Sequence, residues 1–218
     1  MMKLLNYNRV LCISPHPDDV EYSMSGTILK CTDTIFDVLC LTNGGDYDKT
    51  TGISRLDEVR SVWGVSEAKN VNLHFSDVKY MKDKAEDSWV NYIETQFLKT
   101  TNYDCIMTTS QIDSHFEHKI VNNLGPALTR GIWPNRNCPI SIVEYKSPST
   151  LDTWIPNLFI DIESVYHTKL KMLQKFKSQQ HHKYFDRRSL DVFHTNYQCS
   201  KKNMFEVEQF RIVNTFIK

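Results

Sequence analysis

Short apolar runs alternate with longer stretches of helical spacing along the first two thirds of this 218-residue chain. The apolar runs have the length of buried strands, and they cover residues 9–14, 36–41, 71–75, 105–109, 141–145 and 157–160. The segments between them predict helices at residues 19–31, 87–99 and 114–130, and one that reaches residue 68 from a capping box at Ser54 and Asp57. This alternation predicts an α/β fold: a mostly parallel, Rossmann-like sheet with helices on both faces.

The last third of the chain follows a different pattern. Residues 162–180 have the spacing of one long helix, and residues 205–213 alternate like a strand. We find no internal repeat and no low-complexity linker, so we predict a single domain over residues 1–218 with a C-terminal helix-plus-strand extension. The dinucleotide fingerprint G-x-G-x-x-G does not occur, so the sequence gives no support for an NAD site.

Charge and cysteine content narrow the function classes. Lys and Arg number 26, as do Asp and Glu, so there is no basic surplus of the kind that binds nucleic acid. No window of 18 apolar residues and no apolar signal-peptide core occur, so we expect neither a transmembrane segment nor a secreted protein. The six cysteines form no C-x-x-C pair. We therefore expect reduced, structural cysteines in a cytoplasmic protein.

The first polar cluster follows the first predicted strand and reads Ser14-Pro15-His16-Pro17-Asp18-Asp19. In open α/β sheets, ligands bind at the carboxyl ends of the strands, which is where this segment lies. Two prolines stiffen the turn that presents His16, Asp18 and Asp19. Such rigidity suits a metal site, whose ligands must hold their positions closely.

The second polar cluster, Asp113-Ser114-His115-Phe116-Glu117-His118, also follows a strand and opens a helix. His115 and His118 are three residues apart, which places both on one helical face, and Asp113 or Ser114 is expected to cap the helix. A single histidine near a helix start is usually solvated, and carboxylates there usually complement the helix dipole. Because two clusters recur at equivalent positions, we predict that together they offer two imidazoles and a carboxylate to one metal ion.

These segments resemble the motifs of the LmbE-like/PIG-L family of zinc-dependent N-acetylglucosaminyl deacetylases. The first cluster, with Ser25-Gly26-Thr27-Ile28 behind it, resembles the family's opening motif. The second resembles its D-x-H-P-D-H, with Phe116 and Glu117 in place of Pro and Asp. Further similarity, in family order, is found at residues 41–45, 55–58, 63–65, 169–179 and 208–210.

The resemblance implies a role for each matching residue. His16, Asp19 and His118 would coordinate one zinc ion, which the resemblance favours over Fe²⁺, and leave a position open for water. Asp18 would be the general base, and a protonated His115 would stabilise the oxyanion or protonate the leaving amine. Arg55 and Asp77 would bind sugar hydroxyls. Glu117 is expected to keep an orienting contact to the site.

The expected substrate is therefore a small N-acylated amino sugar or sugar conjugate, with acetyl as the expected acyl group. Related proteins are often oligomeric, so a homo-oligomer is left open. Three alternatives also remain: an amidase acting on another N-acyl or thiol conjugate, a catalytically silent sugar-binding or scaffold protein, and a non-haem iron site built from the same two imidazoles and carboxylate. We leave the His181-His182 pair out of the site, because such pairs are usually solvated.

Overall fold

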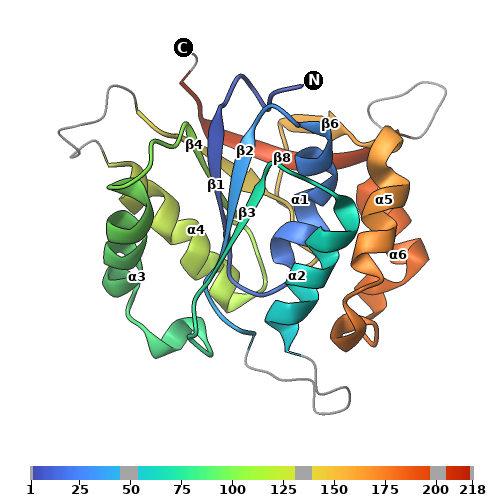
Figure 1. Ribbon diagram of the computed structural model, residues 1–218, viewed down its shortest axis with the longest axis horizontal. Helices are drawn as coiled ribbons and strands as arrows, with labels where there is room; N and C mark the ends of the chain where they lie inside the picture. Colours follow the sequence, from blue (N-terminus) through green and yellow to red (C-terminus); the bar gives the residue numbers. More distant parts are fainter. Residues whose placement is uncertain (1, 45–53, 131–138, 197–204, 217–218) are drawn as a thin grey trace.

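The computed structural model describes residues 2–44, 54–130, 139–196 and 205–216, and its strands form one sheet between two layers of helices (Figure 1). The strands are β1 (Arg9–Ser14), β2 (Ile35–Cys40), β3 (Val71–Phe75), β4 (Cys105–Thr109), β5 (Ser141–Tyr145), β6 (Leu158–Asp161), β7 (Thr195–Asn196) and β8 (Phe205–Asn214). Their order is β3-β2-β1-β4-β5-β8-β6, and β7 pairs with β8 beside this path.

The pairing confirms the predicted sheet. The five strands from β3 to β5 are all parallel, and Val10 of β1 lies opposite both Phe36 of β2 and Cys105 of β4. The C-terminal strand β8 runs antiparallel between β5 and β6. The chain builds β2 and β3 on one side of β1, and then β4 and β5 on the other. The carboxyl ends of β1 and β4 therefore flank a topological switch point, where α/β sheets bind their ligands.

The helices are α1 (Asp19–Lys30), α2 (Arg55–Ser66), α3 (Glu86–Ile93), α4 (Phe116–Thr129), α5 (Glu163–Leu173) and α6 (Arg187–His194). In Figure 1, α3 and α4 cover one face of the sheet, and α1, α2, α5 and α6 lie on the other. Alternate residues of β1 enter two separate cores: Val10 and Cys12 pack on the α1 side, and Leu11 and Ile13 on the α3 side. This alternation is the two-residue period of a strand buried on both faces.

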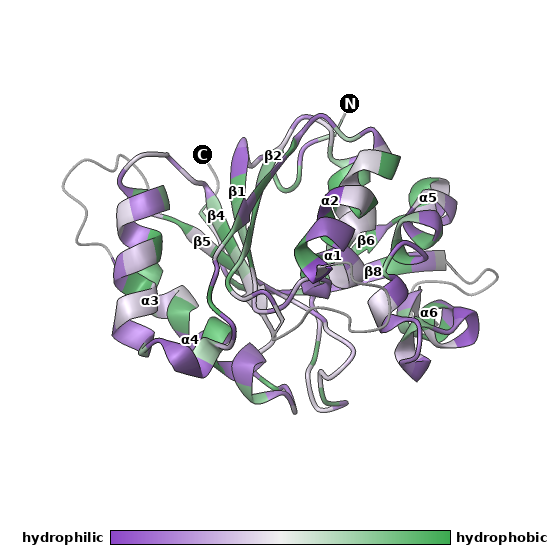
Figure 2. Ribbon diagram, turned by 60° about the horizontal axis from the view of Figure 1, so that its bottom comes forward, coloured by the Kyte–Doolittle hydropathy of each residue, from purple (hydrophilic) through white to green (hydrophobic). Residues whose placement is uncertain are grey.

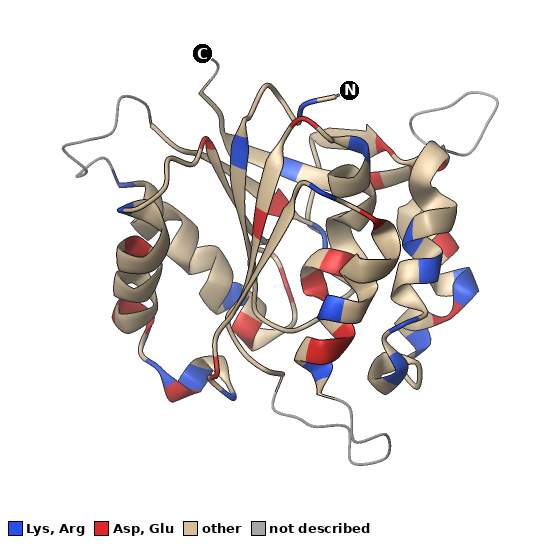
Figure 3. Cartoon of the chain, in the orientation of Figure 1, with Lys and Arg blue, Asp and Glu red and all other residues tan. Residues whose placement is uncertain are grey.

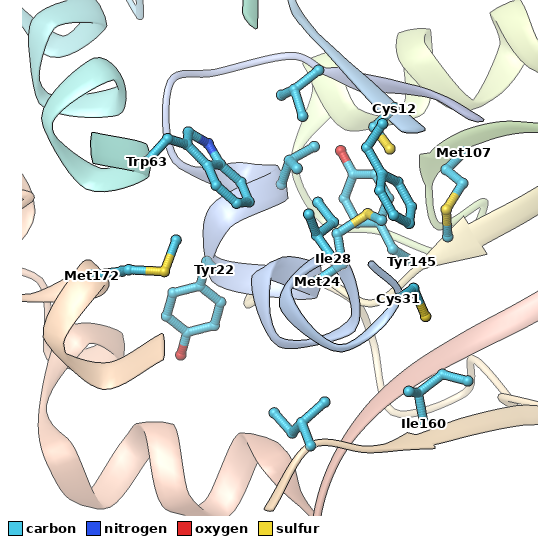
Figure 4. Packing of buried hydrophobic residues seen from close by; sticks show 14 of the residues in the cluster. Cys12, Tyr22, Met24, Ile28, Cys31, Trp63, Met107, Tyr145, Ile160 and Met172 are labelled. Atoms are coloured by element: carbon cyan, nitrogen blue, oxygen red, sulfur yellow. The ribbon is translucent and has the colours of Figure 1, made fainter. Parts of the chain in front are cut away.

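The distribution of polar and charged residues over the elements agrees with the balanced charge of the sequence. Figure 2 shows apolar strands between helices whose outer faces are hydrophilic, and Figure 4 shows the packing around Tyr22, Trp63 and Tyr145 on the α1 side. Basic and acidic residues are interspersed on α2, α5 and α6 (Figure 3). No described helix is long and apolar enough to cross a membrane.

Cysteine usage also fits the prediction, as far as the structure describes it. Cys12, Cys31, Cys40 and Cys105 are free and buried. The other two cysteines, at positions 138 and 199, lie outside the described residues.

Several predicted element bounds are wrong, each for a local reason. The predicted helix over residues 162–180 ends at Leu173, because the chain turns to bury Phe176 and then forms a 3-10 turn at Lys177–Gln179. The predicted helix over residues 87–99 becomes α3 followed by a π-helical turn at Glu94–Leu98. The sequence pattern does not predict α6 or β7.

Candidate active site

A pocket of about 510 Å³ opens at the switch point beyond β1 and β4. The sequence-predicted residues His16, Asp18, Asp19, Arg55, His115 and His118 all line it. They come from the turn after β1, the start of α2 and the start of α4. The parallel sheet thus brings together two clusters that lie about a hundred positions apart in the sequence.

The turn after β1 is held by its own hydrogen bonds. Ser14 Oγ donates to the carbonyl oxygen of His16 over 2.6 Å. The backbone N–H of His16 donates to Asp19 Oδ2 over 2.9 Å, so the Asp19 carboxylate folds back over the turn. As a result, the imidazole and the carboxylate face the same point.

Asp19 is shared by two imidazoles. Its Oδ2 lies 3.1 Å from His16 Nδ1, and its Oδ1 lies 3.2 Å from His118 Nε2. His115 is close by, and one nitrogen from each of His16, His115 and His118 lies within 4.8 Å of the others. Three imidazoles and one carboxylate therefore surround a space that suits a divalent metal ion.

Each of the two imidazoles on Asp19 has a further carboxylate at its other nitrogen. His16 Nε2 lies 2.6 Å from Glu117 Oε2, and His118 Nδ1 lies 3.1 Å from Asp113 Oδ2. Outer carboxylates of this kind fix the ring orientation and raise the basicity of metal-binding histidines. The expected orienting contact of Glu117 is confirmed, and Glu117 Oε1 also accepts a hydrogen bond from the backbone N–H of Met81 over 2.8 Å.

The predicted cap of α4 is wrong. The N-cap residue is His115, and no side chain caps the helix there. Oδ1 of Asp113 accepts a 2.8 Å hydrogen bond from the backbone N–H of His115 itself, and Oδ2 contacts His118 and accepts a 2.6 Å hydrogen bond from Ser147 Oγ. Ser114 Oγ donates to the carbonyl oxygen of Ser149. Asp113 therefore fixes the residue before the helix and orients His118 at the same time.

The charges of the cluster favour a bound cation. Burial alone would lower the pKa of His16, but the hydrogen bond and charge of Asp19, with Glu117, outweigh it and raise that pKa to about 9. Burial likewise opposes charge on His118, yet Asp19 and Asp113 raise its pKa to about 10. The same contacts hold the pKa of Asp19 well below its usual range. Without a metal ion these carboxylates retain protons on the imidazoles, and a divalent cation would take the place of that positive charge.

Asp18 lies beside this cluster and is buried. Burial raises its pKa to about 6, against the opposing charge of Arg55. The guanidinium of Arg55 donates to Asp18 Oδ1 over 3.1 Å and to the carbonyl oxygen of Gly44 over 3.2 Å. Gly44 has φ +72° and lies against Arg55, so a Cβ there would be both strained and obstructed.

His115 stands at the N-terminus of α4 with its ring centroid 4.7 Å from the rings of both His16 and His118. Burial lowers its pKa, and the positive charges on those two histidines lower it further. Both effects disfavour the protonated form of His115 that the resemblance implied.

The predicted substrate contact Asp77 and the histidine pair 181–182 lie differently from the residues above. Asp77 is exposed and is not among the described residues that line the pocket, so its sugar-binding role stays a prediction. Of the histidine pair that we left out, His182 lines the pocket. Tyr22, Tyr80, Gln179 and Tyr184 also line the pocket. Gln179 belongs to the segment 169–179 that resembles the family, whereas no local pattern distinguishes Tyr22 and Tyr184 from core or surface residues. Residues 45–53 lie outside the described part of the chain.

The sequence of this chain is similar to those of known deacetylases. The family model described as "PIG-L: GlcNAc-PI de-N-acetylase" matches residues 11–129. A diacetylchitobiose deacetylase of Thermococcus kodakarensis is 27% identical, over 78% of this chain and 70% of its own length.

Solved structures share the fold. The N,N'-diacetylchitobiose deacetylase of Pyrococcus horikoshii superimposes with a TM-score of 0.73 at 20% identity, over 95% of this chain and 84% of that one. GalB of Pseudomonas putida, a 4-carboxy-2-hydroxymuconate hydratase, gives a TM-score of 0.73 at 16% identity, over 97% and 98% of the two chains. Since a hydratase shares the architecture, these structures speak for the fold alone.

Proposed function

This chain belongs to the PIG-L family of deacetylases, and from that premise we propose that it is a metal-dependent hydrolase that removes an acetyl group from the nitrogen of an amino sugar or sugar conjugate. The observation that carries the proposal is the arrangement around Asp19. Two imidazoles turn one nitrogen each to its carboxylate and the other nitrogen to an outer carboxylate. A buried carboxylate of raised pKa, Asp18, lies beside them.

We assign His16, Asp19 and His118 as the metal ligands. Two imidazoles and one carboxylate match the donor set of catalytic zinc sites, which leave one position open. His115 is close enough to be a competing ligand. However, no carboxylate hydrogen-bonds its ring among the described residues, in contrast to His16 and His118. A zinc ion, when bound, would polarise the amide carbonyl and lower the pKa of a water molecule.

Asp18 supplies the general base. Its pKa of about 6 leaves it ionised above that pH and still basic enough to take a proton from water. Arg55 binds Oδ1, and no described residue donates to Oδ2, so Oδ2 faces the incoming proton. In this arrangement Arg55 orients the base, which is a different role from the sugar contact that the sequence suggested.

His115 acts on the other side of the reacting amide. As a neutral imidazole it donates one N–H to the carbonyl oxygen while negative charge develops there. The proton that Asp18 took from water then passes to the leaving amine, which departs as the free amino sugar while acetate is released.

A substrate panel tests this function. The zinc-loaded protein is incubated with N-acetylated amino sugars, their glycosides and N-acyl thiol conjugates, and acetate release is followed before and after chelation of the metal. We expect chelator-sensitive release from the sugars. Release from the thiol conjugates alone would favour the amidase alternative, and binding of sugars without any release would favour a silent binding protein.

A further inference from the structure

One wall of the pocket has no part in the proposed reaction. It is formed by the segment that follows α5 and carries Gln179, His182 and Tyr184. The ring of His182 lies on the ring of Tyr184, with centroids 5.1 Å apart and an angle of 11° between the planes. Tyr22 Oη donates to the carbonyl oxygen of Tyr184 over 2.8 Å, which ties this wall to α1. This wall therefore presents the stacked rings of His182 and Tyr184 to the pocket.

The ring nitrogens of His182 have no hydrogen-bond partner among the described residues. Its backbone is fixed, since its N–H donates to the carbonyl oxygen of Gln179 over 2.9 Å and its own carbonyl accepts from the N–H of Phe185. No described residue hydrogen-bonds either ring nitrogen, although the ring is half-buried and lines the pocket. A ring that is held by stacking while its nitrogens stay open is suited to contact a ligand.

His182 lines the same pocket as the histidine cluster but stands apart from its rings. His16, His115 and His118 lie in mutual ring contact, and His182 touches none of these three rings. Burial lowers the pKa of His182, and the charges of His181 and Arg55 lower it further. The imidazole is thus neutral at pH 7, with one nitrogen to donate and one to accept.

The charges of the lining argue against an anionic group beside His182. Among the described lining residues, Arg55 is the one Lys or Arg. Its guanidinium already donates to Asp18 Oδ1 and to the carbonyl oxygen of Gly44. A phosphate would find no uncommitted Lys or Arg among the described lining residues, whereas a hydroxyl group, which both donates and accepts, matches a neutral imidazole.

We propose that His182 is a specificity-determining residue that hydrogen-bonds a hydroxyl group of an uncharged sugar unit attached to the N-acetylated sugar. The inference rests on the proposed function, because it takes the reacting amide to lie at the histidine cluster. It narrows the substrate class to neutral glycoconjugates of at least two units.

A pair of matched variants tests the inference. His182→Phe keeps a flat ring to stack on Tyr184 but removes both nitrogens, and His167→Phe makes the same change at an exposed histidine of α5 that does not line the pocket. Binding of N-acetylglucosamine, of the neutral disaccharide N,N'-diacetylchitobiose and of N-acetylglucosamine 1-phosphate is measured by calorimetry on the zinc-loaded proteins. KM and kcat for acetate release are measured alongside, and circular dichroism checks the fold.

We expect His182→Phe to weaken binding of the disaccharide about tenfold and to raise its KM alike, with kcat and monosaccharide binding kept. His167→Phe should match the wild type. Wild-type affinity in His182→Phe, no sugar binding by the wild type, a loss of kcat at unchanged KM, or tightest binding of the phosphate through His182 would each overturn the inference. A wild type that binds the disaccharide through His182 but releases no acetate would refute the proposed hydrolase and leave this inference standing.

Discussion

Asp19 is the residue at which the two halves of the site meet. Its two oxygens face His16 from the turn after β1 and His118 from α4. The sequence predicted this trio from residue types, from the position of each cluster after a strand and from the family resemblance. It also predicted an orienting contact for Glu117, but not that this contact is to the outer nitrogen of His16, nor that Asp113 lies at the outer nitrogen of His118, because those contacts depend on side-chain directions that only the packed fold sets.

Separate removal of two histidines distinguishes the proposed ligand set from a three-histidine cluster. His118→Ala should weaken zinc binding more than the roughly 10- to 100-fold that follows loss of an outer hydrogen-bond partner, because a direct ligand is lost. His115→Ala should keep zinc and lose activity. Metal content after dialysis against a zinc buffer measures both. Retention of zinc by His118→Ala together with its loss from His115→Ala would reverse the assignment.

The metal-free protein should lose stability as the pH rises. The folded-state pKa values of His16 and His118, about 9 and about 10, lie above the ordinary histidine value. Their stabilising contribution is therefore complete below about pH 6.5 and is lost through pH 9 to 10, at no more than roughly 1.4 kcal/mol per pKa unit. Urea unfolding of chelator-treated protein at pH 7 and pH 9.5 measures the slope.

Two variants and the addition of zinc test whether this pH dependence comes from the histidine cluster. The slope should flatten in His118→Asn and persist in His167→Asn, which changes an exposed histidine. Zinc added at pH 8.5 should restore the lost stability, because it replaces the protons on the cluster. An unfolding free energy that rises with pH in the metal-free protein would contradict this account of the cluster.

At the scale of elements, α1 packs closely against β8. The carboxylate of Glu208 on β8 accepts hydrogen bonds from the backbone N–H groups of Gly26 and Thr27 in the middle of α1. A Cβ at Gly26 would lie 2.9 Å from Glu208 Oε1 and from the side chain of Ile162. The sequence pattern placed this helix correctly but gave no sign of the contact with β8, which lies almost two hundred residues away in the chain.

A matched pair of glycine substitutions tests this fit. Gly26→Ala should lower the free energy of unfolding by about 1–3 kcal/mol, because the neighbours must move. Gly64→Ala, on the exposed side of α2 with no atom near its Cβ, should raise it by about 0.5–1 kcal/mol through helix propensity. Thermal or urea unfolding of both variants gives the comparison. Equal stability changes would show that the contact with Glu208 and Ile162 does not constrain α1.

At the scale of the whole molecule, strand order creates the site. Three predicted strands, at residues 9–14, 105–109 and 141–145, match the structure residue for residue, because buried parallel strands are mainly apolar runs. The predicted strand at residues 71–75 also matches, although it is the edge strand β3 and alternates apolar residues with Asn72 and His74. The C-terminal extension was harder to predict, because the chain leaves the helix after Leu173 to bury Phe176, and Ser178 then donates from its N–H and its Oγ to the buried carboxylate of Glu58. A homo-oligomer and a cytoplasmic location stay predictions.

A buried ion pair joins α5 to β8. Lys169 of α5 and Glu208 of β8 are fully buried and pair over 2.5 Å. Lys169→Met should cost about 3–5 kcal/mol of unfolding free energy, because Glu208 is left as an uncompensated buried charge. Lys30→Met, which removes a surface pair with Asp161, should cost less than about 1 kcal/mol. Similar costs in urea unfolding would show that the buried pair does not hold these elements together.

The central claim is that this pocket hydrolyses an N-acetyl group through a metal site with Asp18 as its base. The most direct measurement compares acetate release from N,N'-diacetylchitobiose by zinc-loaded wild type and Asp18→Asn, with zinc content determined on the same samples. We predict that the variant keeps its zinc and that its kcat falls by about 10²- to 10⁴-fold, because the general base is lost while the ligands remain. A wild type that holds zinc yet releases no more acetate than Asp18→Asn, across a broad panel of acyl amides, would contradict the account.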